Sequence, residues 1–148
     1  MLESRFIQVD DKDLAQIAEA FKDEDWEAGQ YQSSLAAGRL KAFLEDPKTS
    51  YLVGYLGGVP AGRIFAYKLT HPSGSQTLFI DEVDVKTAFR RRGVALYLLR
   101  QMLDYAKSQD IAEVWLGAEE DNEAAKNLYR RIPGYVEENS PMFTYRIK

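Results

Sequence analysis

The sequence predicts an α+β fold, in which helices flank a central, mostly antiparallel sheet in a mixed α/β order. Segments with the 3.6-residue spacing of helices alternate along the chain with strand-like runs. Gly57-Gly58 separates two of these runs, as expected for a two-residue hairpin. No repeat or low-complexity linker interrupts this order, so we expect residues 1–148 to form a single domain.

The N-terminal third is expected to contain one strand and two helices. Phe6 to Val9 predicts a short strand, and Asp10 or Asp11 is a candidate N-cap for a helix that ends near Asp23. An acidic loop follows, and a second helix runs to Asp46-Pro47, where the residue before proline leaves the helical conformation. Apolar residues mark one face of each helix: Leu14, Ile17, Ala18 and Phe21, then Leu35, Leu40, Phe43 and Leu44.

The middle of the chain is expected to form three strands. Ser50 to Leu56 and Val59 to Leu69 flank the hairpin glycines. The loop from His71 to Ser75, which contains proline and glycine, separates them from a strand over Thr77 to Val85.

The C-terminal part is expected to begin with a long amphipathic helix. A strand over Glu113 to Gly117 follows, Asp121 or Asn122 is the candidate N-cap of the last helix, and Pro133-Gly134 ends that helix. Met142 to Ile147 is expected to close the sheet. The apolar face of the long helix comprises Val94, Leu98, Leu99, Met102, Leu103 and Ala106.

The composition narrows the class of protein. The chain has 148 residues, no cysteine and a formal net charge of −4. Without cysteine there are no disulfides, thiol catalysis or cysteine zinc sites, which fits a reducing cytoplasm. An acidic chain is unsuited to general nucleic-acid binding, and no apolar run reaches the length of a membrane span. We therefore expect a cytoplasmic protein that binds no nucleic acid, membrane or metal.

A basic turn at the start of the long helix is the strongest sign of a binding site. The first amides of a helix lack intrahelical acceptors and lie at the positive end of its dipole, so they stabilise an anion such as a phosphate. Gly93 lets the backbone come close, and Lys86 adds to the positive charge. The alternative is a basic helix start on a solvated surface, because short motifs match often. The turn consists of Arg90, Arg91, Arg92, Gly93, Val94 and Ala95.

A later helix start, Asn122 to Tyr129, completes a recognisable pattern. Together the two helix starts resemble the acetyl-CoA site of the GNAT superfamily of N-acetyltransferases, whose signature is Gln/Arg-x-x-Gly-x-Gly/Ala followed by an Asn…Tyr pair. The resemblance covers residues 49–137 and implies the GNAT fold, with the sheet splayed between its fourth and fifth strands. It also implies that the pantetheine arm of acetyl-CoA hydrogen-bonds the backbone around Val83 and Val85. The pyrophosphate would lie on amides of residues 91–95, with Arg90 at the Gln/Arg position and Asn122 contacting the cofactor.

The implied chemistry is direct attack of a neutral amine on the thioester, which needs an acid and a base. By the resemblance Tyr129 lies near the cofactor sulfur and protonates the leaving thiolate; the alternative is a tyrosine packed on the core. Glu82 is the candidate base because a carboxylate beside the cleft can take a proton directly or through water. The alternative is an exposed carboxylate beside a water chain that does this work. We expect Asp81 and Asp84 to face away from Glu82.

Three clusters of acidic residues in the sequence indicate that the acceptor is a cation. Such runs are usually solvated, but acids along the cleft would attract a cationic amine. Among them we expect Asp25, Asp81, Glu119 and Glu120 to bind substrate, with Trp26 as a loop aromatic.

A closer resemblance narrows the identity of the acceptor molecule. Lys48 to Val53, Ala66 to Leu69, Phe79 to Val85 and the tail from Phe143 are similar to class I aminoglycoside 3-N-acetyltransferases. Pro133, and Asp84 where a small residue is common, depart from that pattern. The resemblance therefore implies an aminoglycoside acetyltransferase, an antibiotic-resistance enzyme, that pairs as a homodimer. The alternatives are acetylation of a polyamine or a peptide amine, and a non-catalytic acyl-CoA-binding module.

Overall fold

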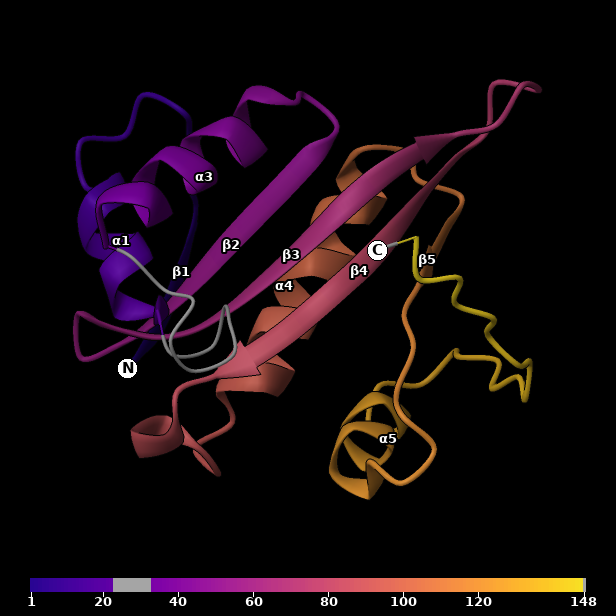
Figure 1. The fold of residues 1–148 in the computed structure, drawn as a ribbon. Coiled ribbons are helices and arrows are strands. Elements are labelled where there is room, and N and C mark those ends of the chain that lie inside the picture. The colour runs from indigo at the N-terminus through magenta and orange to yellow at the C-terminus, as the bar shows by residue number, and fades with distance from the viewer. Residues whose placement is uncertain (23–32, 148) are drawn as a thin grey trace.

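The computed structural model describes residues 1–22 and 33–147, and it confirms the α+β fold. Helices and strands are labelled in Figure 1. The strands are β1 (Leu2–Phe6), β2 (Thr49–Leu56), β3 (Val59–Thr70), β4 (Gln76–Val85) and β5 (Glu113–Trp115). The helices are α1 (Leu14–Ala20), α3 (Ser33–Glu45), the short 3₁₀ turn η1 (Thr87–Phe89), α4 (Val94–Ser108) and α5 (Glu123–Arg130).

The strands form one sheet in the order β1-β2-β3-β4-β5. The first three pairs are antiparallel, whereas β4 and β5 run parallel. Their pairing joins only Thr77–Phe79 to Glu113–Trp115, so the remainder of β4 has no partner in β5 and the two strands part (Figure 1). The predicted mostly antiparallel, splayed sheet is therefore confirmed.

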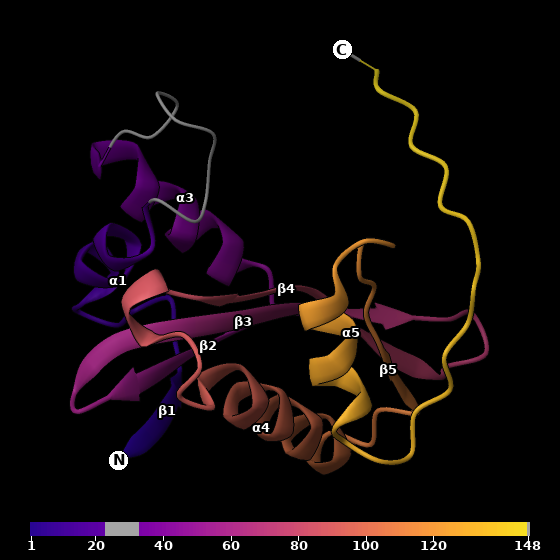
Figure 2. The ribbon, with the colours of Figure 1, turned by 90° about the horizontal axis from the view of Figure 1, so that it is seen from below.

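Helices cover both faces of this sheet. Figure 2 shows α1 and α3 on one face, α4 on the other, and α5 beside the opening between β4 and β5. Between the sheet and α4 lies one apolar cluster, which includes Ile64, Leu78, Leu98 and Met102. A second cluster beneath α1 and α3 includes Ile17, Phe21, Leu40 and Val53. The described residues of all three predicted apolar helix faces are therefore buried in these clusters or packed against them.

Glycines shape the sheet at two points. Gly57 and Gly58 have φ of 61° and 79°, which is the left-handed pair that a tight hairpin requires, so the predicted hairpin is confirmed. Gly62 of β3 lies so close to its neighbours that an added Cβ would stand 2.8 Å from the Asp84 carbonyl oxygen and 2.9 Å from Val94 Cγ1. Gly62 thereby lets β3 pack closely against α4 and β4.

Two predictions for the N-terminal region are wrong. The first strand begins at Leu2 rather than Phe6, because Leu2–Phe6 pairs with β2 and its side chains alternate between partly buried and exposed. Neither candidate aspartate caps the first helix, which begins at Leu14. The Asp11 carboxylate instead accepts hydrogen bonds from Arg5 and the Gln8 amide.

The C-terminal part also differs from the prediction. β5 ends at Trp115 rather than Gly117, because its parallel pairing with β4 stops there. Residues 142–147 form no strand and do not close the sheet; Phe143, Tyr145 and Ile147 are 80 to 87% exposed. Their alternation shows that the segment suits a strand, but periodicity does not say which edge a strand reaches. In Figure 2 this segment extends away from the sheet.

Candidate functional site

A bulge in β4 brings two acidic side chains to one place. Opposite Phe65 and Ala66 of β3, the partners in β4 are Glu82 and Ile80, so Asp81 is an extra residue. Ile80 is buried against α4, whereas both Asp81 and Glu82 line a cavity on the opposite face of the sheet. The expectation that Asp81 and Asp84 face away from Glu82 is wrong. The bulge breaks the alternation before Glu82, and Glu82 and Asp84, two residues apart, contact the same partner on one face.

We call this space of about 360 Å³ the aromatic cavity. The ring of Phe43 meets those of Tyr51, Phe65 and Tyr67 edge-on, at centroid distances of 5.5 to 6.1 Å. Tyr51 and Phe65 stack on each other at 5.8 Å. The full lining consists of Ala18, Arg39, Leu40, Phe43, Tyr51, Arg63, Phe65, Tyr67, Asp81 and Glu82.

Arg63 is a buried cation in the wall of the aromatic cavity. The residue is 2% exposed, and its guanidinium lies 5.3 to 5.8 Å from the rings of Phe21, Tyr51 and Phe65. Its Nε donates to Asp84 Oδ2 at 3.1 Å, its Nη1 to the Tyr51 hydroxyl at 3.1 Å, and its Nη2 to Glu82 Oε2 at 3.5 Å. Sequence reasoning missed this residue, although a charge inside the apolar run from Ala61 to Ala66 is an unusual signal.

The carboxyl of Glu82 titrates near neutral pH. Burial raises its pKa, and the hydrogen bond and negative charge of Asp84 raise it further, to about 7, while the charge of Arg63 acts in the opposite direction. The side chain of Glu82 nevertheless remains 46% exposed, so solvent and small molecules reach it. A carboxylate with such a pKa can accept a proton from an amine at neutral pH and release it again.

A second cavity, of about 350 Å³, lies beside α5 and is called the α5 cavity. Tyr129 lines it and also packs against the apolar cluster between the sheet and α4, and its role as the acid stays a prediction. Burial and the charge of Asp84 raise the pKa of Tyr129, which keeps the phenol protonated. Asp84 therefore acts on Glu82 and Tyr129 alike. The lining comprises Gly117, Ala118, Glu119, Asn122, Ala125, Tyr129 and Met142.

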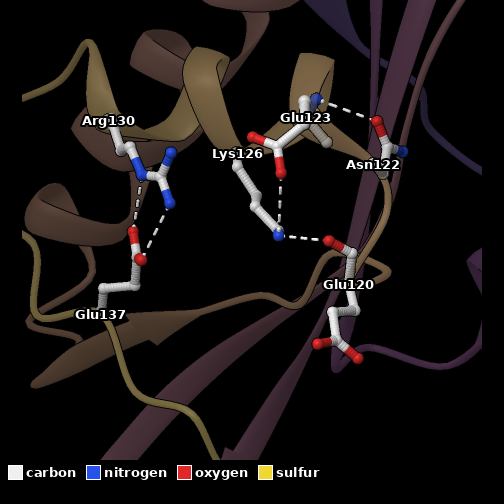
Figure 3. Close-up of polar contacts among 7 residues, drawn as sticks. Glu120, Asn122, Glu123, Lys126, Arg130 and Glu137 are labelled. Carbon is white, nitrogen blue, oxygen red and sulfur yellow. Dashed lines mark hydrogen bonds and ion pairs between the residues drawn. The ribbon is translucent and has the colours of Figure 1, made fainter.

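Polar contacts hold the start of α5 in place (Figure 3). Of the two candidate N-caps, Asp121 and Asn122, it is Asn122 that caps the helix: its Oδ1 accepts a hydrogen bond from the Ala125 amide at 3.0 Å. Lys126 donates to the Glu120 carbonyl oxygen and pairs with Glu123 at 3.3 Å. These contacts position the loop that carries Glu119 and Glu120, and the Glu120 carboxylate points away from the labelled partners. At the other end of the helix, Arg130 binds Glu137 through two nitrogens, at 2.7 and 2.9 Å.

The basic turn before α4 has the geometry of an anion site. Gly93 adopts φ 79° as the N-cap residue, and Arg91 also has a positive φ of 62°. The first intrahelical hydrogen bond runs from the Tyr97 amide to Gly93, so the amides of residues 94–96 precede it. No heavy atom lies within 4 Å of a Cβ built on Gly93. This open space fits the pyrophosphate of a CoA-type cofactor.

The side chains of the turn have different surroundings. Arg90, Arg91 and Arg92 are exposed, and Arg90 Nε donates to the Val85 carbonyl oxygen at 3.3 Å, which ties the turn to the end of β4. The side chain of Val94 is buried in the core, so this residue offers a ligand only its backbone. Val83 is paired with Ile64 in the sheet.

The predicted substrate residues divide between the two cavities. Asp81 lines the aromatic cavity and Glu119 lines the α5 cavity, while Glu120 lines neither. Asp25 and Trp26 lie outside the described residues. Among the residues that are described, no cluster of histidine and acidic side chains could hold a metal ion, and no helix is long and apolar enough to cross a membrane.

The start of α4 has the geometry of an anion site, and the aromatic cavity carries a carboxyl group with a pKa of about 7, a combination typical of a protein that acts on small molecules. Residues 12–135 match the family model described as the acetyltransferase (GNAT) family. The chain therefore belongs to the GNAT family of acetyltransferases, and the resemblance seen in its helix starts is confirmed.

Comparisons with individual proteins agree with this family. An L-2,4-diaminobutyric acid acetyltransferase of Vibrio parahaemolyticus is 33% identical over 85 residues, 57% of this chain. The match spans 45% of that relative's length. An aminoglycoside acetyltransferase from an uncultured soil metagenomic sample, solved with trehalose, has a TM-score of 0.85 at 20% identity over 99% of this chain and 97% of its own. A ribosomal-protein-alanine N-acetyltransferase of Brucella melitensis has a TM-score of 0.76 at 18% identity, covering 99% of this chain and 100% of its own. At these identities the two structures show a shared fold.

Proposed function

We propose that the protein transfers the acetyl group of acetyl-CoA to a primary amine of a cationic small molecule, with an aminoglycoside as the first candidate. The observation that carries this proposal is the aromatic cavity, in which Asp81 and Glu82 stand beside four aromatic rings. Carboxylates attract a cationic amine, and aromatic faces stabilise it. The cavity lies toward the small end of the range for ligand sites, so it suits one amino-bearing ring while the rest of the molecule stays outside.

In this proposal, acetyl-CoA binds with its pyrophosphate at the amides that open α4 and with its thioester between β4 and α5. The cofactor supplies the activated acetyl group. Glu82 takes the proton that the amine loses as its nitrogen bonds to the acetyl carbon, and Tyr129 gives its phenol proton to the departing sulfur. The raised pKa of each side chain suits its role, because Glu82 is partly ionised and Tyr129 is neutral at pH 7.

A second candidate acceptor is a diamino acid. Arg39 also lines the aromatic cavity, and a guanidinium is the side chain that best recognises a carboxylate. The relative from Vibrio parahaemolyticus is named as an acetyltransferase of a diamino acid. In contrast, one structural neighbour was solved in complex with the aminoglycoside sisomicin. Arg39 therefore favours a small zwitterion, and Asp81 with Glu82 favours a polycation.

The test is thiol release from acetyl-CoA with a gentamicin-type aminoglycoside, diaminobutyric acid, spermidine and a lysine peptide. Mass spectrometry and NMR locate the acetylated nitrogen. The proposal expects the aminoglycoside to give the highest kcat/KM, and Arg39→Gln to leave that value largely unchanged. A preference for diaminobutyric acid that Arg39→Gln abolishes would establish the second candidate. Acetyl-CoA binding without turnover of any amine would identify a non-catalytic acyl-CoA-binding module.

A further inference from the structure

Arg63 contacts two acidic side chains, Glu82 and Asp84, near the C-terminal end of β4. One guanidinium reaches Asp84 through Nε and Glu82 through Nη2, on the same face of the sheet. The side chain of Arg63 is 3% exposed, that of Asp84 26% and that of Glu82 46%. Burial therefore decreases from the cation outward, and Glu82 is the member of this triad that a ligand can reach.

The two carboxylate contacts of Arg63 differ in strength. The Arg63–Asp84 contact, at 3.1 Å, has hydrogen-bond geometry, whereas the Arg63–Glu82 contact, at 3.5 Å, is at the limit for one. Of these two carboxylates, Asp84 makes the closer contact with the buried cation, and a buried cation without a carboxylate would be strongly unfavourable.

The guanidinium itself has little freedom to move. It donates to the Tyr51 hydroxyl at 3.1 Å and lies over three aromatic rings, including that of Phe21 from outside the strands. A planar group held on its faces and at its edge keeps its donors in fixed directions. Arg63 therefore provides a rigid reference for the carboxylates that it contacts.

We infer that Arg63 is a positioning residue: paired with Asp84 in the wall of the aromatic cavity, it holds the Glu82 carboxylate toward the acceptor. This inference rests on the proposed role of Glu82 as the base. The guanidinium binds Asp84 firmly and Glu82 loosely, so Glu82 stays free to exchange a proton. Arg63 touches no reacting atom in this scheme and acts only through Glu82.

The charges around Glu82 give the inference a specific signature. On its own strand Asp81 and Asp84 disfavour the ionised carboxylate, while Arg63 on β3 favours it. Arg39 on α3, together with the hydroxyls of Tyr51 and Tyr67 on β2 and β3, lines the same cavity. Removal of Arg63 should therefore raise the pKa of Glu82, and neutralisation of Asp84 should lower it.

The experiment titrates the ¹³C-labelled glutamate carboxyls of the purified chain by NMR, with the Glu82 signal assigned from its loss in Glu82→Gln. Arg63→Met should move the Glu82 midpoint to higher pH, and Asp84→Asn should move it to lower pH. A midpoint that rises from pH 7 to pH 8 lowers the ionised fraction at pH 6 about tenfold. Arg63→Lys, which keeps the charge, should restore most of the wild-type midpoint. With any acceptor that is turned over, the midpoint of the acid side of the kcat/KM profile should shift in the same direction as the Glu82 midpoint in each variant.

The matched control is Arg5→Met, which removes an arginine of β1 that pairs with Asp11 and Asp13 away from the cavity. It should leave the Glu82 midpoint unchanged. Shifts of the same sign in Arg63→Met and Asp84→Asn, or no shift in either, would overturn the inference. If Arg63→Met does not fold, Asp84→Asn decides, and a rise or no change in the midpoint refutes the inference.

These readouts separate the inference from the proposed function. The NMR titration needs no acceptor, so opposite shifts without turnover of any amine would reject the proposed function and keep the positioning of Glu82 by Arg63. Turnover of an amine, together with a Glu82 midpoint that is the same in Arg63→Met, Asp84→Asn and the wild type, would keep the proposed function and reject the positioning of Glu82 by Arg63.

Discussion

Replacement of Glu82 by glutamine removes the carboxylate that is proposed to accept the amine proton. Glutamine keeps the size and hydrogen-bonding reach of the side chain but cannot become ionised. The expected consequence is a large loss of turnover at neutral pH, since a positioned general base contributes typically ~10²–10⁴ in rate. Deprotonation of the free amine raises the rate of both proteins as the pH rises, but only the wild type also gains from ionisation of Glu82. The ratio of variant to wild type should therefore fall between pH 6 and pH 8 and become constant above that range.

The pKa of Glu82 sets the shape of the wild-type profile. A midpoint of about 7 means that the ionised fraction is roughly 0.1 at pH 6, 0.5 at pH 7 and 0.9 at pH 8. The wild-type kcat/KM should therefore rise about tenfold between pH 6 and pH 8 through this group alone. In Glu82→Gln that step should vanish and leave only the rise from deprotonation of the amine.

The assay measures kcat/KM for one acceptor from pH 5.5 to 9 in the wild type, Glu82→Gln and Glu3→Gln, with the pH range chosen to bracket the midpoint of about 7. Glu3 is an exposed carboxylate on β1 of the same sheet, so its variant should match the wild type at every pH. A constant ratio of Glu82→Gln to wild type across the range would refute the role of Glu82 as the base.

Three further substitutions test other parts of the site. Tyr129→Phe should keep acetyl-CoA affinity and lower kcat by ~10²–10⁴, because the phenol donates only as the sulfur leaves; an unchanged kcat leaves Tyr129 as a packing residue. Gly93→Val should weaken acetyl-CoA binding in calorimetry, because a branched residue strains the backbone at φ of 79° and its side chain would fill the open space proposed for the pyrophosphate; unchanged affinity in a variant that circular dichroism shows to be folded contradicts the phosphate cradle. Gly62→Ala should destabilise the protein by ~1–3 kcal/mol, because its Cβ would press on the Asp84 backbone. In chemical denaturation the matched control Gly38→Ala, in an open part of α3, should instead stabilise the protein, and equal behaviour of the two variants would be contrary to this packing.

Local sequence patterns predicted the elements whose geometry depends on their own residues. Gly57-Gly58 required a tight hairpin, and Gly93 with the amphipathic run after it required a helix start at Val94. Both are confirmed because left-handed φ values and helical periodicity are properties of a short segment. Asn122 as the N-cap of α5 is confirmed for the same reason.

The errors arose where the partner of a segment decides its structure. Leu2–Phe6 becomes a strand through its pairing with β2, and residues 142–147 remain unpaired despite an alternating pattern. The bulge at Asp81 depends on the register between β3 and β4, so simple alternation assigned the wrong faces to the acids. Arg63 was missed because its importance depends on aromatic rings from two other segments of the chain, at Phe21 and Tyr51, and on the carboxylates of β4.

The most direct test of the central claim is a crystal structure of the protein with CoA and an acetylation-competent amine bound together. The account predicts the pyrophosphate at the amides that open α4 and the CoA sulfur beside Tyr129. It predicts the acceptor in the aromatic cavity, with its reactive nitrogen about 3 Å from the Glu82 carboxylate or joined to it by one water. CoA bound elsewhere, or an amine whose reactive nitrogen faces away from both Glu82 and the sulfur, would contradict the account.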